Sequence, residues 1–334
     1  MTDLVVTTPL LHADLELFCS LQVGSELNPG IVTRHAPDAL LNVLRDGQAQ
    51  ARGSLWWQAV PDNPGERLGF IGHYAACDAC SALEILSAAC LALAAQGCTL
   101  AVGPIDGSTW RRYRLLKERG REPPFFLEPD NPDEWPGHFE AAGFKACARY
   151  YSSINEDNAR DRNRSDLEKQ IARDGYTLRT LALHDIESEL DRLWRLSSEA
   201  FRDNLFYAPI TRDEFHAIYA PLLNRIKPEL VLIMECSNAQ VAFCLAVPDL
   251  LQAARGQPVD TVILKSIAVE KSHRGKGLAA VLLSRLNRTA RSLGMHRTIH
   301  ALMHEGNPSR QLSNGLMRDF RCYTLYSKRL SGQL

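Results

Sequence analysis

Residues 264–286 read LKSIAVEKSHRGKGLAAVLLSRL, which is apolar at both ends and basic and glycine-rich in the middle. The first part has the character of a buried strand, and the last part repeats leucines at helical spacing. The turn between them holds Gly275 and Gly277, with Arg274 and Lys276 beside the glycines. Glycines ahead of a helix let a phosphate approach the unpaired N–H groups of the first turn, where the helix dipole is positive. The pattern therefore predicts a phosphate-binding turn between a strand and a helix.

The composition is that of an ordinary globular protein. The chain has 334 residues, of which 45% are hydrophobic and 23% charged, and this length favours two domains of about 150 residues each. No apolar run is long enough to span a bilayer, and no signal-peptide pattern opens the chain. The nine cysteines are scattered among apolar neighbours, which indicates reduced thiols. We therefore expect a cytoplasmic protein without a membrane partner.

Charge is distributed unevenly along the chain. Residues 1–150 hold 12 basic and 18 acidic side chains, whereas residues 271–334 hold 12 basic and two acidic ones. A basic field of this kind attracts an anion, either a phosphorylated small molecule or nucleic acid. The overall pI of 6.8 and the lack of a nucleic-acid-binding motif argue against nucleic acid.

The chain divides at a polar segment, residues 155–166, into a first domain over 1–155 and a second over 166–334. In the second domain, the patterns predict the order β-α-α-β-β-β-α-β-α-β, which implies a mixed sheet with helices on both faces. The first domain repeats this order, which indicates an internal duplication. The first domain also carries a proline-rich insertion, residues 121–136, which we expect to be a stiff surface loop that helps to wall a cleft.

The residues of the turn resemble the GNAT acetyltransferase superfamily. Its pyrophosphate-binding signature, Arg/Gln-x-x-Gly-x-Gly/Ala, is matched by Arg274, Gly277 and Ala279 without a gap. The family also places an asparagine after the next strand and a phenylalanine at the start of the last one, and Asn307 and Phe320 occupy these places. At the corresponding join the first domain reads CDACSALE, with no glycine and no basic residue. The chain is thus similar to a tandem GNAT protein whose first copy has lost the cofactor loop.

The resemblance implies a mixed α/β fold, with two GNAT-like domains that are each a mostly antiparallel sheet flanked by helices. It also implies that acetyl-CoA binds in the second domain and that an acceptor amine attacks the thioester directly. The pyrophosphate would lie on the turn and the pantetheine arm beside the preceding strand. The residues implied in cofactor binding are Ile267, Ala268, Val269, Arg274, Gly275, Lys276, Gly277, Leu278, Ala279, Asn307 and Ser309.

Catalysis needs a base, because a free amine near neutral pH is mostly ammonium. The tyrosine and the glutamate that the family often uses are absent, and Asn314 and Ser266 stand roughly in their places. The candidates for proton transfer are therefore polar residues on or beside the central and last strands: Glu235, Asp249 and Tyr326, followed by Asp260 and Tyr323. If none of them acts, the alternative function is a non-catalytic protein that binds or senses acyl-CoA.

The acceptor is expected to be a small amine or the end of a peptide. The loop FRDNLFYAPI, residues 201–210, lies where the family lines its acceptor site, and we assign Glu199, Asn204 and Tyr207 to acceptor binding. No metal is expected. His296, His300 and His304 recur every four residues, but the segment has the pattern of a strand, which separates neighbouring histidines by roughly 13 Å. The sequence predicts no oligomeric state.

Overall fold

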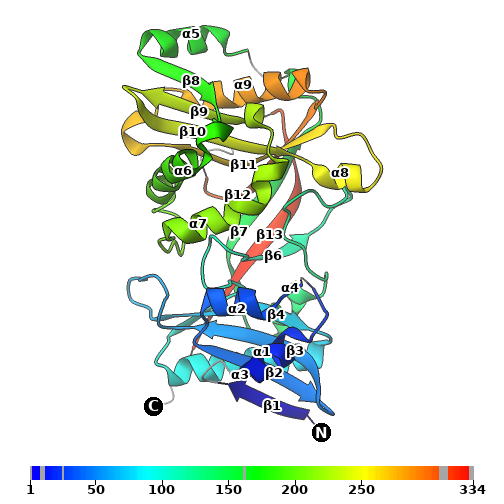
Figure 1. Ribbon diagram of the computed structural model, residues 1–334. Helices are drawn as coiled ribbons and strands as arrows, with labels where there is room; N and C mark the ends of the chain where they lie inside the picture. Colours follow the sequence, from blue (N-terminus) through cyan, green and yellow to red (C-terminus); the bar gives the residue numbers. More distant parts are fainter. Residues whose placement is uncertain (1, 8–11, 25, 161–162, 308–314, 331–334) are drawn as a thin grey trace.

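The computed structural model describes residues 2–7, 12–24, 26–160, 163–307 and 315–330. Within these ranges thirteen strands form one mixed sheet that runs through two lobes (Figure 1). The strands are β1 Thr2–Thr7, β2 Ala39–Arg45, β3 Gln48–Trp56, β4 Leu68–Ala76, β5 Leu100–Gly103, β6 Leu115–Glu118, β7 Lys145–Asn155, β8 Tyr176–Thr180, β9 Val231–Cys236, β10 Ala239–Pro248, β11 Thr261–Val269, β12 Arg297–His304 and β13 Arg318–Arg329.

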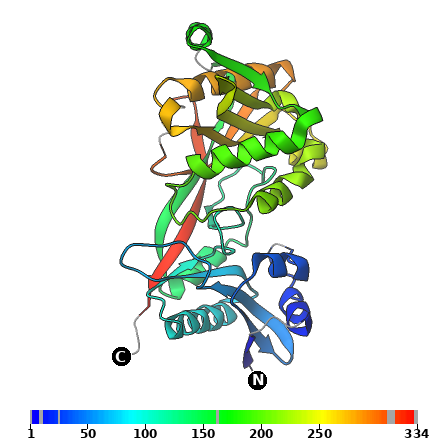
Figure 2. The same ribbon diagram turned by 60° about the vertical axis from the view of Figure 1, so that its left-hand side comes forward.

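Nine α-helices lie in the described ranges and cover both faces of the sheet (Figure 2). They are α1 His12–Cys19, α2 Pro29–His35, α3 Ala79–Ala95, α4 Trp135–Ala141, α5 Ser165–Arg173, α6 Ile186–Ala200, α7 Arg212–Tyr219, α8 Leu250–Ala254 and α9 Leu278–Ser292. Short 3-10 turns are η1 Asn158–Arg160, η2 Leu183–Asp185, η3 Ala220–Arg225, η4 Pro228–Leu230 and η5 Lys271–His273. None of these helices combines the length and the hydrophobicity that crossing a bilayer requires.

The expected fold class is confirmed, and the two halves repeat one plan. Only the pairs β4–β5 and β11–β12 are parallel, and the other described pairs are antiparallel. In the second half, α9 packs its leucines on one face of β9–β11, and α6 and α7 cover the other face. In the first half, α3 covers one face of β2–β4, while α1 and α2 cover the other. Apolar side chains recur at every second residue of the strands and at every third or fourth residue of the helices, so that they face each other in the core.

The two half-sheets are joined by an exchange of their last strands. The strand order is β1-β2-β3-β4-β5-β13-β7-β12-β11-β10-β9-β8, and β6 pairs with β13 off this path. The last strand of the chain, β13, thus lies beside β5 of the first half, and β7, which ends the first half, lies beside β12 of the second. Both strands are long and run through the two lobes (Figure 1). The halves therefore share one continuous backbone hydrogen-bond network.

Candidate functional site

The turn between β11 and α9 has the backbone that the sequence predicts. Gly275 and Gly277 have φ angles of 80° and 81°, a left-handed conformation that favours glycine. Helix α9 begins at Leu278, and no described side chain caps its first turn. The first N–H groups of a 15-residue helix are therefore without a side-chain acceptor, at the end where the helix dipole is positive.

Two cations and a histidine surround this helix end. The exposed Arg274 lies across the end of β11 and donates from Nε to the carbonyl oxygen of Val269, at 3.2 Å. Lys276 donates to the hydroxyl of Tyr176 at 2.8 Å, and this hydrogen bond raises the pKa of the lysine. The same hydroxyl contacts Nδ1 of His273 at 2.8 Å. The sequence analysis did not single out Tyr176, because this residue comes from β8, almost a hundred residues earlier.

Strand β11 separates from β12 just before this turn. Their parallel pairing covers Thr261–Leu264 of β11 and Arg297–His300 of β12, and no described residue continues it. A β-bulge at Lys265 interrupts the pairing of β11 with β10 at the same level. The segment Ile267–Val269 therefore has β10 as its only described neighbouring strand. This open edge is where the pantetheine arm is expected.

The remaining predicted cofactor residues lie around the same opening or outside the described residues. Leu278 is buried in the core beneath α9, and Ala279 is half-buried in the first turn. Asn307 follows β12, is exposed, and donates its N–H to the carbonyl oxygen of His304 at 2.9 Å. Ser309 and Asn314 lie outside the described residues.

The structure does not bring the three catalytic candidates together. Glu235 lies on β9, two strands from β11, and its carboxylate forms an ion pair with Arg179 at 2.7 Å. Tyr326 lies on β13 in the core of the first half, where its hydroxyl donates to Glu140 at 3.2 Å. The first-half position of Tyr326 is a direct result of the strand exchange.

Asp249 lies at the far end of β11. Its Oδ1 accepts hydrogen bonds from the backbone N–H groups of Phe126 and Leu251, at 2.8 and 3.2 Å. Asp260 nearby accepts from Gln252 at 2.6 Å. These contacts fix the short helix α8 and the proline-rich insertion, so both carboxylates have structural partners.

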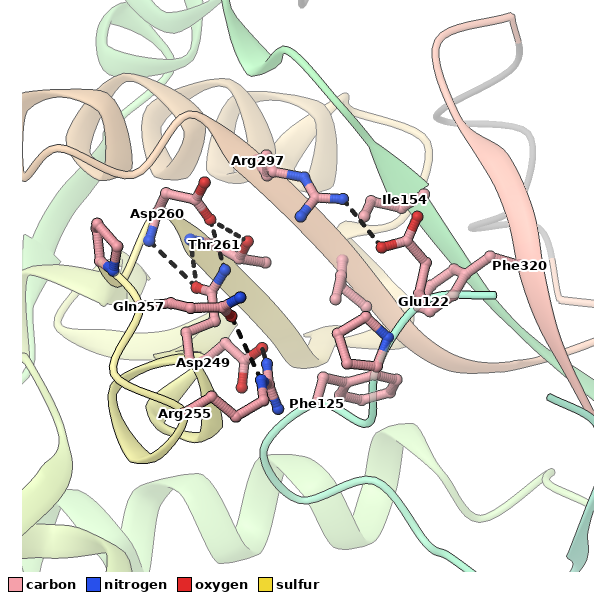
Figure 3. Close-up of a pocket in the computed structure, with 14 residues that line it drawn as sticks. Glu122, Phe125, Ile154, Asp249, Arg255, Gln257, Asp260, Thr261, Arg297 and Phe320 are labelled. Atoms are coloured by element: carbon pink, nitrogen blue, oxygen red, sulfur yellow. Dashed lines mark hydrogen bonds and ion pairs between the residues drawn. The ribbon is translucent and has the colours of Figure 1, made fainter. Parts of the chain in front are cut away.

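Asp249 and Asp260 line a cavity of about 350 Å³. The insertion forms one wall through Glu122 and Phe125, and Figure 3 shows Glu122 joined to Arg297 opposite the α8 side. The cavity lies at the start of β11 and β12, whereas the opening described above lies at the other end of β11. The insertion is thus ordered and walls a cavity, as expected, but at the opposite end from the cofactor turn.

The acceptor candidates lie in or beside the loop between α6 and α7, which contacts the first half. Tyr207 is half-buried, and its hydroxyl donates to the carbonyl oxygen of Ser198 at 3.0 Å. Its ring lies 6.1 Å from that of Trp110, and the Trp110 indole donates to the carbonyl oxygen of Ala208 at 3.0 Å. Glu199 and Asn204 are exposed beside it. The first half therefore helps to hold the loop that was assigned to the acceptor.

In the first half, the corresponding turn lies between β4 and α3, and side chains of the chain itself fill the space around it. Helix α3 begins directly after β4, and the carboxylate of Asp78 accepts from the N–H of Ser81 at 2.8 Å. This carboxylate occupies the place at the helix end that an anionic ligand would take. Gly72 lies against the backbone of Ile105, where an added Cβ would come within 2.2 Å of the carbonyl oxygen. The gap between β4 and β5 is thus filled by protein.

His35, His73 and Asp106 gather in this closed region, with their ligand atoms within 4.8 Å of one another. Such a set offers metal ligands, but Nδ1 of His35 and Nε2 of His73 are only 2.8 Å apart and share a hydrogen bond. Burial and the charges of nearby arginines lower the pKa of both histidines to about 3. An electropositive environment of this kind opposes a cation, so we interpret the group as internal packing.

Two further cations near the opening were missed by the sequence analysis. Lys265 is a lysine within an otherwise apolar strand, which was an available signal. Arg114 comes from the loop between β5 and β6, and nothing in its sequence neighbourhood relates it to β11. Tyr219 of α7 was also missed; it forms a hydrogen bond with Ser266 of β11, while burial raises its pKa to about 12.

Comparisons with known proteins agree with this architecture. Residues 190–312 match the sequence model of the Acetyltransferase (GNAT) family. A tandem GNAT protein from the clavulanic acid biosynthesis pathway is similar in fold, with 12% identity, a TM-score of 0.50 and 99% of each chain covered. A probable N-acyltransferase from Enterococcus faecalis V583 is 10% identical with a TM-score of 0.56, and the alignment covers 100% of this chain and 74% of that one.

A third similar structure is part of a larger protein. It is a fungal multi-domain GH3 beta-N-acetylglucosaminidase with a GCN5-related glucosamine N-acetyltransferase region, 11% identical with a TM-score of 0.56. The match covers 98% of this chain, which spans only 38% of the length of the fungal one. No curated protein sequence matches the chain. Residues 190–312 thus match the Acetyltransferase (GNAT) family in sequence, and the fold of the whole chain is similar to that of a tandem GNAT protein.

Proposed function

We propose that the protein is an acyl-CoA-dependent N-acyltransferase, with acetyl-CoA as its acyl donor and a small amine or a peptide end as acceptor. The observation that carries the proposal is the turn between β11 and α9, where two left-handed glycines precede a helix end without a side-chain cap. The contrast with α3 supports it, since there a carboxylate of the chain itself occupies the helix end.

The residues present fit coenzyme A. The first N–H groups of α9 would hold the pyrophosphate, with Arg274 and Lys276 adding positive charge beside it. The open edge of Ile267–Val269 supplies backbone groups for the amides of the pantetheine arm. When bound, the cofactor supplies a thioester whose carbonyl carbon is open to attack by an amine.

The chain's own residues would then position the acceptor and take part in proton transfer. The loop of Asn204 and Tyr207 faces the first half and would orient the amine, which must lose a proton before it attacks. The hydroxyls of Ser266 and Tyr219, hydrogen-bonded to each other beside the open edge, are the donors that we assign to the leaving thiolate. The first half would complete the acceptor side, and a cytoplasmic location stays an expectation.

Calorimetric titration with acetyl-CoA tests the proposal. Wild-type protein should bind acetyl-CoA and free coenzyme A, and release of free thiol should follow when an amine acceptor is added. Ala279→Glu places a carboxylate in the first turn of α9, where it interacts favourably with the helix dipole but occupies the pyrophosphate position. We expect this variant to stay folded and to lose measurable binding.

Ala79→Glu, a matched substitution in the first turn of α3, should leave the affinity for acetyl-CoA unchanged. Binding without thiol release in the presence of any tested amine would favour a non-catalytic acyl-CoA-binding protein. Equal affinity in wild type and Ala279→Glu would exclude the assigned turn.

A further inference from the structure

Arg114 is a buried cation for which the described residues supply no counter-ion. Its side chain is only 9% exposed, and the guanidinium lies between the rings of Tyr113 and Tyr150, 3.9 and 4.0 Å from their centroids. Two of its nitrogens, Nε and Nη1, are buried and have no hydrogen-bond partner among the described residues. Stacking on two aromatic faces stabilises the charge, but it leaves the donors along the edge of the guanidinium unsatisfied, which is costly inside a protein.

The backbone at this position is also unusual. Arg114 has a φ angle of 67°, a strained conformation that side-chain-bearing residues adopt rarely. Such strain persists only where surrounding contacts hold it in place, and it is enriched at ligand sites. The N–H of Arg114 donates to the carbonyl oxygen of Pro104 at 2.9 Å, which anchors the loop.

A second cation, on β11, lies within the electrostatic influence of Arg114. Lys265, at the bulge of β11, is partly buried, and its ammonium group has no hydrogen bond or ion pair with a side chain or backbone group of the described residues. Burial lowers the pKa of its ammonium group, and the positive charge of Arg114 lowers it further. Two like charges that are both removed from water repel each other, and an anion placed between them would relieve the repulsion.

The position of the pair relates it to the acceptor rather than to the cofactor phosphates. Tyr150 shares an apolar cluster with Phe206 of the acceptor loop, and Tyr113 and Leu302 of β12 pack against that cluster. Leu278 and Val281 of α9 belong to a different cluster on the other face of the sheet. Lys265 itself lies where β11 parts from β12. The cations thus lie beside the acceptor loop and the open edge of β11, away from the helix end assigned to the pyrophosphate.

We propose that Arg114 and Lys265 together bind an oxyanion of the acceptor, so that the substrate is an amine that carries a carboxylate or a phosphate. The inference rests on the proposed function and names its substrate class. The planar fork of Arg114 offers two parallel donors, which match the two oxygens of either group. The first half then has a direct part in specificity, because it supplies the arginine.

The main test measures thiol release with pairs of acceptors in which one member carries an anionic group and the other does not. The pairs are L-amino acids with their primary amides, and phosphoethanolamine with ethanolamine. Wild type should prefer the charged member of at least one pair, and the pair that responds distinguishes a carboxylate from a phosphate. In Arg114→Gln and Lys265→Gln, kcat/KM for the charged member should fall roughly tenfold to a hundredfold, while the neutral member stays near its wild-type value.

Lys169→Gln, which removes an exposed lysine on α5, serves as the charge-matched control and should change neither member. Equal loss for both members of each pair in Arg114→Gln and Lys265→Gln would overturn the inference, since it indicates a structural role. A wild-type preference for succinyl-CoA over acetyl-CoA that Arg114→Gln abolishes would also overturn it, because the anion would then belong to the acyl group.

A second readout does not depend on turnover. The unfolding temperature of wild type should rise with inorganic phosphate or glutarate above that in chloride of equal ionic strength, and it should rise less in Arg114→Gln and Lys265→Gln. The same rise in wild type and both variants overturns the inference. Acetyl-CoA titration of the same proteins separates the two proposals. Absence of cofactor binding refutes the proposed function, and cofactor binding without charge discrimination refutes only the substrate class.

Discussion

The buried imidazoles of His35 and His73 fill the region between β4 and β5 of the first half, where the second half has its open edge. Nδ1 of His73 contacts the hydroxyl of Ser54 at 2.8 Å, and Nε2 contacts His35. The backbone N–H of His73 donates to the carboxylate of Asp106 at 2.6 Å. Both rings are held in the neutral form, because burial and the neighbouring Arg111 oppose a further positive charge.

The lowered pKa values of His35 and His73 predict that the folded protein loses stability in mild acid. The folded pKa of each histidine is about 3, below the value of about 6.5 expected in the unfolded chain. Between these values the unfolded chain binds more protons, so the free energy of unfolding falls as pH decreases from about 6.5 toward 3. In urea unfolding measured from pH 7 to 4, His35→Gln should reduce the pH dependence by about one proton relative to wild type. An unchanged dependence would mean that His35 is already charged in the folded protein.

Single residues also show what the sequence could predict of the site. Arg274, Gly277 and Ala279 lie in one short segment, so their spacing alone indicates the geometry of a strand, a turn and a helix. Arg114 is different, because its environment is made by Tyr150 and by a strand of the other half. Local patterns contain no information about such contacts, which depend on the assembled sheet.

The turns that lead from a strand into α3 and into α9 differ in what satisfies the first N–H groups of the helix. Each helix must satisfy the N–H groups of its first turn. Helix α3 does so with Asp78, which also lies 3.4 Å from Arg45, whereas α9 leaves them to a ligand or to solvent. The sequence predicted a glycine-rich, basic turn before α9 and its absence before α3, but it did not identify the cap that Asp78 provides.

Asp78→Ala should therefore lower the free energy of unfolding. Loss of an N-cap carboxylate destabilises a helix by about 1 kcal/mol, with a range of 0.5–2, and the urea midpoint should fall accordingly. Asp78→Asn keeps an oxygen acceptor and should recover most of the loss. Neither variant should alter the affinity for acetyl-CoA. A change in that affinity would show that the first half also takes part in cofactor binding.

The arrangement of the whole molecule is the part that the sequence did not reveal. Alternating apolar residues identify β7 and β13 as strands, but the alternation is satisfied equally by any partner that offers an apolar face. The exchange places Tyr326 in the first half and Glu128 of the insertion beside Arg321 of β13, in an ion pair that is almost fully buried. Assignment of Tyr326 as catalytic followed from treating the last strand as part of the second half alone.

The strand exchange predicts that neither half folds alone. A fragment that ends at Arg160 lacks β13, so the paired edge of β5 would be exposed, and a fragment that begins at Asn163 lacks β7 beside β12. Each would present unpaired backbone groups and lose part of its core. Separately produced fragments should show no cooperative urea transition and no near-ultraviolet circular dichroism. Produced together, they should form a one-to-one complex with the spectrum of the intact chain and should bind acetyl-CoA. If either fragment alone unfolds cooperatively, its missing strand is dispensable, and the two halves are then independent domains that only share an edge.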